Sequence, residues 1–243
     1  MNLVQERARI RECLFPAGCA ICGEMLLDPE EALNGICEKC GGLFRISEEG
    51  RCEKCGKPLI SEHTCCMQCR QPDAATHYFE RIISIYPYRG VFHTMLHAYK
   101  FDHVAALGNF LIKQLDRAKG FFPDSAMENA VWVPVPPRPG KIKKAGWDQI
   151  EYLAQLLEKK HRHALTLPVH RCLGRLSAQS QKELGMLGRK TNLAGRIKCI
   201  KKVPRTALLF DDVFTTGSTM AACAQALQTH GTEKVYGICL FYA

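Results

Sequence analysis

The sequence predicts an α/β fold in which a cysteine-rich N-terminal module precedes a domain built on a mainly parallel sheet covered by helices. Two observations predict it. Ten of the 14 cysteines among the 243 residues lie between Cys13 and Cys69. From residue 80 onward, continuous apolar runs alternate with segments of helical period, which is typical of parallel strands buried on both faces. With 47% hydrophobic and 23% charged residues, the chain has the composition of a globular protein.

The elements of the second part follow in chain order. Apolar and β-branched runs predict strands at 81–88, 130–136, 205–212 and 235–243. Apolar residues at helical spacing predict helices at 92–101, 104–116, 147–161 and 218–231, the last closed by Gly231 as a C-terminal cap. Residues 1–13 read as an amphipathic opening helix. In a sheet of this kind, ligands bind beyond the carboxyl ends of the strands.

Charge divides the chain at about residue 75. Residues 1–75 hold 9 Lys and Arg against 12 Asp and Glu, whereas residues 76–243 hold 24 against 12, for a total of +9. The excess is densest between Arg138 and Arg205, with 17 basic and 4 acidic residues. We therefore expect two domains, 1–75 and 76–243, with the boundary in QPDAATH (71–77). A basic surface of this density favours phosphate-bearing partners.

The cysteines of the first part form four C-x-x-C pairs. A two-residue gap lets one turn present two thiolates to one ion, and tetrahedral zinc takes four. Eight ligands therefore predict two structural Cys₄ zinc sites, because a closed site leaves no open position for catalysis. A redox role is the less favoured alternative. The sequence leaves open whether the sites are sequential (first pair with second), which we favour, or interleaved. The ligands are Cys19, Cys22, Cys37, Cys40, Cys52, Cys55, Cys66 and Cys69.

A glycine directly follows three of these pairs, at Gly23, Gly41 and Gly56. This fits a zinc knuckle, in which a residue of positive φ turns the chain so that backbone amides point at the sulfurs. The neighbouring Cys65 has no C-x-x-C partner, so Cys66 is the better ligand.

Compartment is also suggested by the sequence. The first residues carry no apolar stretch of the kind a secretory signal needs. Paired cysteines in a chain that is not exported read as metal ligands rather than disulfides. No apolar run approaches the roughly 18 residues of a membrane helix. We therefore expect a cytoplasmic protein without membrane insertion.

The sharpest motif is LLFDDVFTTGST, Leu208 to Thr219. A buried strand delivers Asp211 and Asp212, and a turn rich in hydroxyl side chains then opens a helix. A helix N-terminus offers free N–H groups and the positive end of the helix dipole, which favour a phosphate, and Gly217 allows close backbone approach. The carboxylates can accept hydrogen bonds from sugar hydroxyls. Together these parts describe a ribose-phosphate site that lacks the Walker P-loop pattern.

This motif closely resembles the phosphoribosyl pyrophosphate (PRPP) motif of type I phosphoribosyltransferases. The chain as a whole resembles the ComF family, in which a zinc-binding module is fused to a phosphoribosyltransferase-like domain associated with natural competence and DNA uptake. Besides the cysteine pairs, the stretches that carry the resemblance are AYKF (98–101), WVPVPPRPGKIKKAGWDQIEYLA (132–154) and SQKELGMLGRKTNL (180–193). They span nearly the whole chain in family order.

The resemblance implies a role for each part of the site. Asp211 and Asp212 would be catalytic residues that hold the ribose hydroxyls, directly or through Mg²⁺. The turn of Thr215, Thr216, Gly217, Ser218 and Thr219 would bind the 5′-phosphate. The pyrophosphate would lie at the turn of Pro136, Pro137 and Arg138. A loop at 171–189 would close over PRPP with Gln181, Lys182 and Arg189, and Lys100 is a further basic candidate.

One segment departs from the family pattern. Where the family favours Arg-Gly-Phe-Asn-Gln, this chain reads Ala145-Gly146-Trp147-Asp148-Gln149. The loss of the arginine and the change of asparagine to aspartate weaken the case for anion binding there. Lys141, Lys143 and Lys144 are positioned in the sequence to compensate.

The resemblance implies a PRPP-binding protein acting in DNA uptake, natural transformation or DNA utilisation, with two structural zinc ions, Mg²⁺ and PRPP as cofactors. Its implied partners are PRPP or another ribose phosphate, single-stranded DNA and the DNA-uptake machinery. Two alternatives remain open. One is a non-catalytic adaptor that binds single-stranded DNA and retains a phosphate site, and the other is a nucleobase phosphoribosyltransferase of salvage metabolism. Nothing in the sequence identifies an acceptor, so turnover is also left open.

Overall fold

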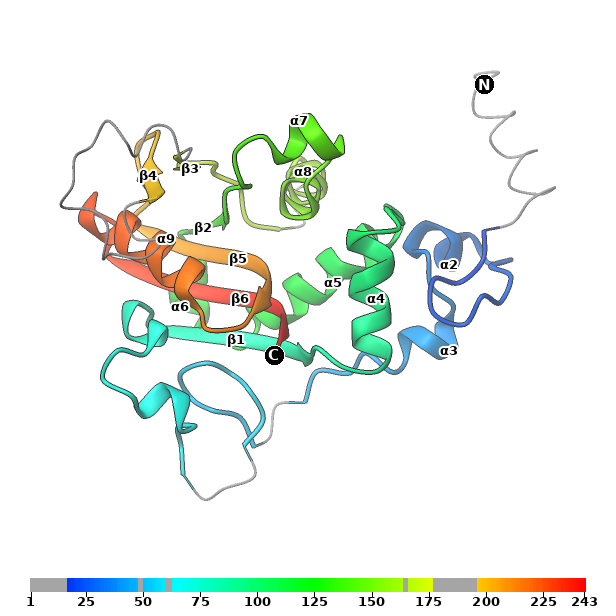
Figure 1. Cartoon of the computed structure of the whole chain (residues 1–243), viewed down its shortest axis with the longest axis horizontal. Coiled ribbons are helices and arrows are strands. Elements are labelled where there is room, and N and C mark those ends of the chain that lie inside the picture. The colour runs from blue at the N-terminus through cyan, green and yellow to red at the C-terminus, as the bar shows by residue number, and fades with distance from the viewer. Residues whose placement is uncertain (1–16, 48–49, 60–62, 164–165, 177–195) are drawn as a thin grey trace.

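The computed structural model in Figure 1 describes residues 17–47, 50–59, 63–163, 166–176 and 196–243. The expected helix at 1–13 lies outside these ranges. A four-stranded sheet forms the centre of the C-terminal part, with strand order β1-β6-β5-β2 and every neighbouring pair parallel. The strands are β1 (Arg81–Pro87), β2 (Ala130–Pro134), β5 (Thr206–Phe214) and β6 (Lys234–Tyr242). The predicted mainly parallel sheet is confirmed.

Helices cover both faces of this sheet. Successive side chains of a strand point to opposite faces, and β5 divides its apolar residues accordingly. Leu208 and Phe210 belong to a core shared with α4 (Val91–Lys100), α5 (Leu107–Lys119) and α8 (Gln149–His161). Leu209 instead packs with α9 (Ser218–Thr229) on the other face. The short helices α6 (Asp124–Met127) and α7 (Lys141–Ala145) precede and follow β2.

The cysteine-rich part is made of short elements. They are α2 (Pro29–Asn34), α3 (Glu38–Gly41) and the single-turn 3₁₀ helices η1 (Gln68–Arg70) and η2 (Ala75–Tyr78). Figure 1 shows this part in two pieces, one beside α4 and α5 and one beyond the edge strand β1. The first piece packs through Phe44, whose ring lies edge-on to Tyr86 and Phe110 at centroid distances of 5.3 and 5.4 Å.

The second piece continues the hydrogen bonding of the sheet edge. The backbone N–H of Ile82 donates to the carbonyl of Lys54 at 2.8 Å, and that of Ser84 donates to the carbonyl of Cys55 at 3.1 Å. The guanidinium of Arg51 donates to the carbonyl oxygens of Ser84 at 2.9 Å and Ile85 at 3.3 Å. Backbone groups that an edge strand would leave open are thereby satisfied. Both pieces share apolar cores with the sheet domain.

Several boundaries differ from those expected. The helix predicted at 104–116 begins at Leu107, and the one predicted at 147–161 begins at Gln149 because Asp148 caps it. Helix α9 ends at Thr229, and Gly231 follows with φ 104°. The sequence did not predict an antiparallel pair of three-residue strands, β3 (Leu173–Arg175) and β4 (Ile197–Cys199). Such short runs carry too little periodicity to be recognised.

Candidate functional site

Each predicted group of four cysteines comes together in space. Within Cys19, Cys22, Cys37 and Cys40, and again within Cys52, Cys55, Cys66 and Cys69, all sulfurs lie within 4.8 Å of one another. The sequential pairing is therefore the one that the chain adopts, and Cys66 rather than Cys65 completes the second group. Four convergent thiols are the donor set that tetrahedral zinc takes in structural sites. These are two Cys₄ zinc-binding sites.

Backbone amides face the sulfurs, as in a zinc knuckle. The N–H of Cys37 donates to Sγ of Cys19 at 3.4 Å, and the N–H of Cys66 donates to Sγ of Cys52 at 3.3 Å. Such donors stabilise thiolate ligands. Gly23 and Gly56 have the expected positive φ, 77° and 68°. The expectation for Gly41 is wrong: this residue is the last of helix α3, so the helix itself turns the chain there.

A cavity of about 650 Å³ opens at the carboxyl ends of β2 and β5. Its volume is in the range of small-molecule sites. It brings together segments that are far apart in the sequence, as the rule for parallel sheets requires. The charged side chains that line it are Lys100, Arg138, Lys141, Lys144, Asp148, Arg175, Asp211 and Asp212.

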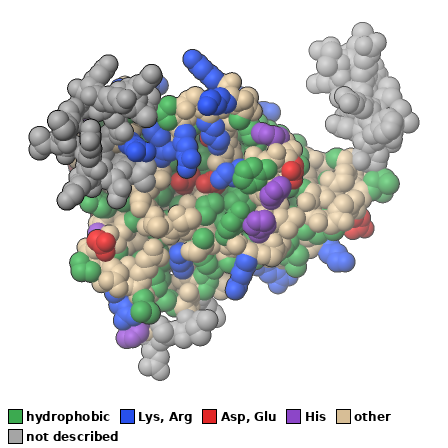
Figure 2. Space-filling view, in the orientation of Figure 1, with side chains coloured by type: hydrophobic (Ala, Val, Ile, Leu, Met, Phe, Trp, Pro, Cys, Tyr) green, Lys and Arg blue, Asp and Glu red, His purple; other side chains and the backbone are tan. Residues whose placement is uncertain are grey.

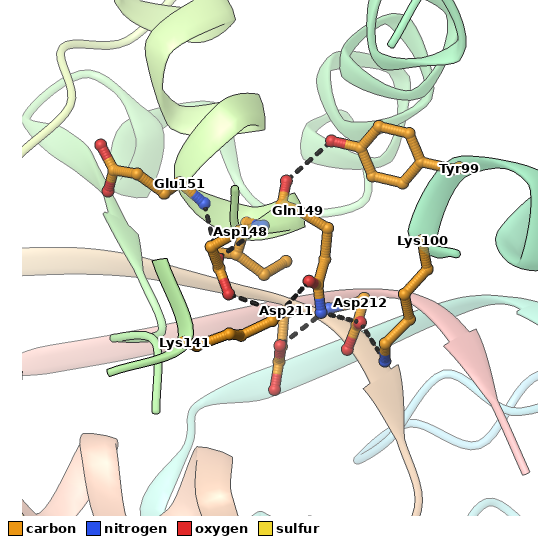
Figure 3. Close-up of polar contacts among 9 residues, drawn as sticks. Tyr99, Lys100, Lys141, Asp148, Gln149, Glu151, Asp211 and Asp212 are labelled. Carbon is orange, nitrogen blue, oxygen red and sulfur yellow. Dashed lines mark hydrogen bonds and ion pairs between the residues drawn. The ribbon is translucent and has the colours of Figure 1, made fainter. Parts of the chain in front are cut away.

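The acidic pair lies in the last part of β5, which continues to Phe214, and its two carboxyls are unlike (Figure 3). Oδ2 of Asp212 accepts from Nζ of Lys100 at 2.8 Å and from Nε2 of Gln149 at 2.7 Å. Burial opposes ionisation of Asp212, but these two donors outweigh it and hold its pKa below the ordinary value. Burial and the charge of Asp212 raise the pKa of Asp211 well above its usual range. In the described part of the chain, Asp211 has no ion-pair partner.

Asp148 and Gln149 are further residues of the site. The sequence indicates them only as part of the segment 145–149 that departs from the family pattern, without a role for either. The hydroxyl of Tyr99 donates to the backbone oxygen of Gln149 at 2.7 Å, which fixes the residue that in turn contacts Asp212. Oδ1 of Asp148 accepts the N–H groups of Ile150 and Glu151, both at 3.0 Å, and so caps α8. An aspartate immediately before a helical pattern of apolar residues is the sequence signal that would have identified Asp148 as the N-cap.

The departure from the family pattern has a local compensation. Nζ of Lys141 lies 2.7 Å from Oδ2 of Asp148 and also contacts the side-chain oxygen of Gln149. The aspartate therefore keeps the capping function of an asparagine, and Lys141 neutralises the added charge. Trp147 packs edge-on to Tyr99 at a centroid distance of 5.1 Å, which is a core contact rather than a ligand-binding one.

The turn that opens α9 has the expected shape. Gly217 precedes the 12-residue helix with φ 75°, and its side is closed by Phe214, whose ring a Cβ would meet at 2.7 Å. No side chain of the described residues caps this helix. Oγ1 of Thr216 lies 2.8 Å from Oγ of Ser218, and the N–H of Ser218 donates to Oγ1 of Thr216 at 3.3 Å. Anions bind at helix starts of this kind.

The candidate residues are not all brought to one surface. Thr219, Pro137, Arg138 and Lys100 line the main cavity together with the acidic pair. Thr216 and Ser218 line a second cavity, of about 380 Å³, between α9 and the segment of η1 and η2. Thr215 is exposed. Gln181, Lys182 and Arg189 lie outside the described residues.

The fold and these sites define the class of the protein: a double zinc-ribbon module followed by an α/β domain whose parallel sheet is consistent with a type I phosphoribosyltransferase-like fold. Residues 10–70 match the model of the double zinc ribbon domain. None of the described helices is both long and apolar enough to cross a bilayer.

Relatives resemble the chain over most of its length. The competence protein ComFC of Streptococcus pneumoniae is 24% identical over 89% of this chain and 96% of its own. The DNA utilization protein YhgH of Escherichia coli K12 is 28% identical over 85% of this chain and 89% of its own. The competence protein ComFC of Bacillus subtilis is 25% identical over 85% of this chain and 82% of its own. These findings confirm the resemblance to the ComF family that the motifs indicate.

Proposed function

We propose that the chain binds PRPP in the cavity at the end of β5 and acts in the handling or utilisation of DNA. The observation that carries the proposal is the arrangement around Asp211 and Asp212. The acidic pair, a cluster of cations and Thr219 of the helix start line one cavity, and the rest of the uncapped turn 215–218 precedes Thr219 directly in the chain. A sugar with a phosphate at one end and a pyrophosphate at the other needs these three kinds of contact.

The residues divide the ligand between them. Asp211 and Asp212 accept hydrogen bonds from the ribose hydroxyls, and the turn 215–219 binds the 5′-phosphate through its N–H and hydroxyl groups. Arg138, Lys141 and Lys144 attract the pyrophosphate. The two predicted units, 1–75 and 76–243, thus carry zinc and sugar-phosphate binding respectively.

A carboxylate with a raised pKa also fits a divalent cation. Asp212 is held by Lys100, whereas Asp211 is ionised only at the cost of burial beside another charge. Oxygen donors of this type suit Mg²⁺, which would neutralise Asp211 together with the pyrophosphate oxygens. The chemistry that Mg²⁺ supplies is stabilisation of a leaving pyrophosphate.

The biological part of the proposal rests on the relatives, which are named for competence and for DNA utilization. Natural transformation and DNA uptake, with single-stranded DNA as a partner, are the corresponding roles for this chain. A binding role without turnover is the second candidate. It is favoured by Asp148, which adds a carboxylate where pyrophosphate would lie and occupies Lys141.

Calorimetry of the zinc-loaded protein tests the proposal. PRPP, ribose 5-phosphate and pyrophosphate are titrated separately in the presence of Mg²⁺. We expect PRPP to bind at least tenfold more tightly than either fragment, because it engages both ends of the cavity. Equal affinity for pyrophosphate and PRPP would contradict a ribose site. Pyrophosphate release from bound PRPP, measured with a panel of nucleobases, distinguishes the catalytic candidate from the binding one.

A further inference from the structure

The exposed side of α4 carries a row of four aromatic rings. Tyr88 precedes the helix, and His93, His97 and Phe101 follow at intervals of four residues, which places them on one helical face. The ring centroids of successive members are 4.8, 6.2 and 5.0 Å apart. We call these four residues the α4 ring row.

Three of the four rings, those of His93, His97 and Phe101, are exposed to solvent, whereas Tyr88 is half-buried against the core. Phe101 is 57% exposed, and the side chain of His97 is 51% exposed. Figure 2 shows histidine and hydrophobic side chains gathered over α4, on the face that also carries the Lys and Arg side chains of the cleft. The opposite side of α4 supplies Met95, Leu96 and Tyr99 to the core. The core therefore does not account for the exposed rings.

The charge around the row suits a polyanion. Helix α4 contains no Asp or Glu. Arg89 is exposed next to Tyr88, and Nζ of Lys100 lies 6.0 Å from the ring centroid of Phe101. The nearby Asp102 accepts from Nδ1 of His97 at 3.2 Å, so its charge orients that ring. Lys100, next to Phe101 at the last position of the row, contacts Asp212 in the cavity. The row therefore ends beside the cavity.

We propose that the α4 ring row is a stacking surface for the bases of single-stranded DNA, which it leads toward the cavity. Exposed aromatic rings beside positive charge are the means by which proteins hold single strands, since every base offers a face to stack on. The ring spacing of about 5–6 Å suits successive unpaired bases, whereas a duplex keeps its bases stacked on one another. The inference rests on the proposed role in DNA handling, and it assigns that role to one helix face.

Two probes of equal charge test the surface. Fluorescence anisotropy measures the affinity of the full-length zinc protein for oligo(dT) and for an abasic strand of the same length. We expect wild type to prefer oligo(dT) at least tenfold. Phe101→Ala and His93→Ala should each weaken oligo(dT) binding about tenfold, within the roughly 5- to 150-fold range that the loss of one base–ring stack implies. Neither variant should change binding of the abasic strand.

Matched variants complete the experiment. Leu27→Ala removes an exposed apolar side chain (79% exposed) from the first zinc ribbon and should leave oligo(dT) affinity unchanged, and Phe101→Trp should restore it. Equal binding of the two probes by wild type, or wild-type affinity in both alanine variants, would overturn the proposal. Titration of the wild type with PRPP and with oligo(dT) keeps the two hypotheses apart. If PRPP binds and oligo(dT) does not, the stacking surface alone is wrong, and the reverse result rejects only the PRPP site.

Discussion

Nζ of Lys100, the last residue of α4, lies 2.8 Å from Oδ2 of Asp212 on β5, across 112 residues of sequence. This ion pair decides which of the two adjacent carboxyls is ionised. Asp212 has its charge compensated, whereas Asp211 remains a half-buried carboxyl without a cation of its own in the described residues. Ionisation of Asp211 is therefore unfavourable in the ligand-free protein, and a cation or hydrogen bonds from sugar hydroxyls would favour it.

The first prediction concerns the stability of the ligand-free protein. Asp211→Asn should stabilise it at pH 8, because the raised pKa of Asp211 means that its carboxylate costs stability in the folded state. Asp212→Asn should destabilise it by roughly 1–3 kcal/mol, because Lys100 loses its partner. Urea denaturation measures both, with the exposed Glu233→Gln as a control that should change little.

The stability changes caused by Asp211→Asn and Asp212→Asn should depend on pH in different ways, because the pKa values of the two carboxyls are shifted in opposite directions. The folded-state pKa of Asp211 is raised, so its carboxylate costs stability at high pH, and that cost is lost as pH falls through the raised pKa. The gain from Asp211→Asn should therefore shrink as pH falls from 8 toward the ordinary carboxyl range. The folded-state pKa of Asp212 is lowered, so its contribution persists throughout this interval and falls away only below the ordinary carboxyl range. A pH-independent gain from Asp211→Asn would refute the assignment.

A second prediction uses the departure from the family pattern. Asp148→Asn keeps a good cap for α8 and frees Lys141. Pyrophosphate should bind at least roughly fivefold more tightly, because removing one unit of negative charge from the buried Asp148 is worth at least about 1 kcal/mol. Calorimetry at low salt measures this. Asp148→Ala is the matched variant, since it removes the same charge but also the cap, at a cost of about 1 kcal/mol in stability. Unchanged or weaker binding by Asp148→Asn would show that Lys141 does not serve the anion.

A third prediction tests the zinc ligand sets. The wild-type protein should hold two zinc ions. Cys19→Ser/Cys40→Ser removes two ligands from one group and should leave one ion, whereas Cys19→Ser/Cys55→Ser removes one from each group and should leave none or weakly held metal. Metal analysis after gel filtration distinguishes these outcomes. If the first double variant lost both ions, the two groups would not be independent.

A fourth prediction concerns the turn at Gly217. A Cβ at this position would lie 2.7 Å from Ala75 Cβ and from the ring of Phe214, and φ is 75°. Gly217→Ala should therefore cost more than about 2 kcal/mol of stability and weaken phosphate binding. Gly146→Ala has a nearly identical φ, 76°, in the same left-handed region but meets no atom within 4 Å, so it should cost only about 1 kcal/mol. Comparable losses in the two variants, measured by urea denaturation, would argue against close packing at the turn.

What could be predicted from the sequence was local in the chain. The C-x-x-C pairs indicate metal ligands, and the acidic strand followed by a glycine turn indicates a phosphate site. Each of these patterns is complete within about a dozen residues. The contacts that set the acidic pair apart do not. Lys100 and Gln149 reach Asp212 from 112 and 63 residues away, and only the stacking of α4 and α8 on one face of the sheet brings them together. Lys100 was a candidate without a stated partner.

Two further misses have physical reasons. Gly41 was expected to need a positive φ, but α3 continues through it and Gly42 follows in a helical conformation. The strands β3 and β4 are three residues each, and β3 lies within the segment 171–189 that was expected to close over PRPP. Their pairing depends on contacts between distant residues rather than on a local pattern, which is why periodicity could not reveal them.

Calorimetric titration of Mg²⁺ and PRPP into the zinc-loaded wild type and into Asp211→Asn tests the central claim most directly. The account predicts saturable binding by the wild type with one PRPP per chain, and at least tenfold weaker binding by a variant that is equally folded and still holds two zinc ions. Absence of binding by the wild type, or the same affinity in Asp211→Asn, would contradict it.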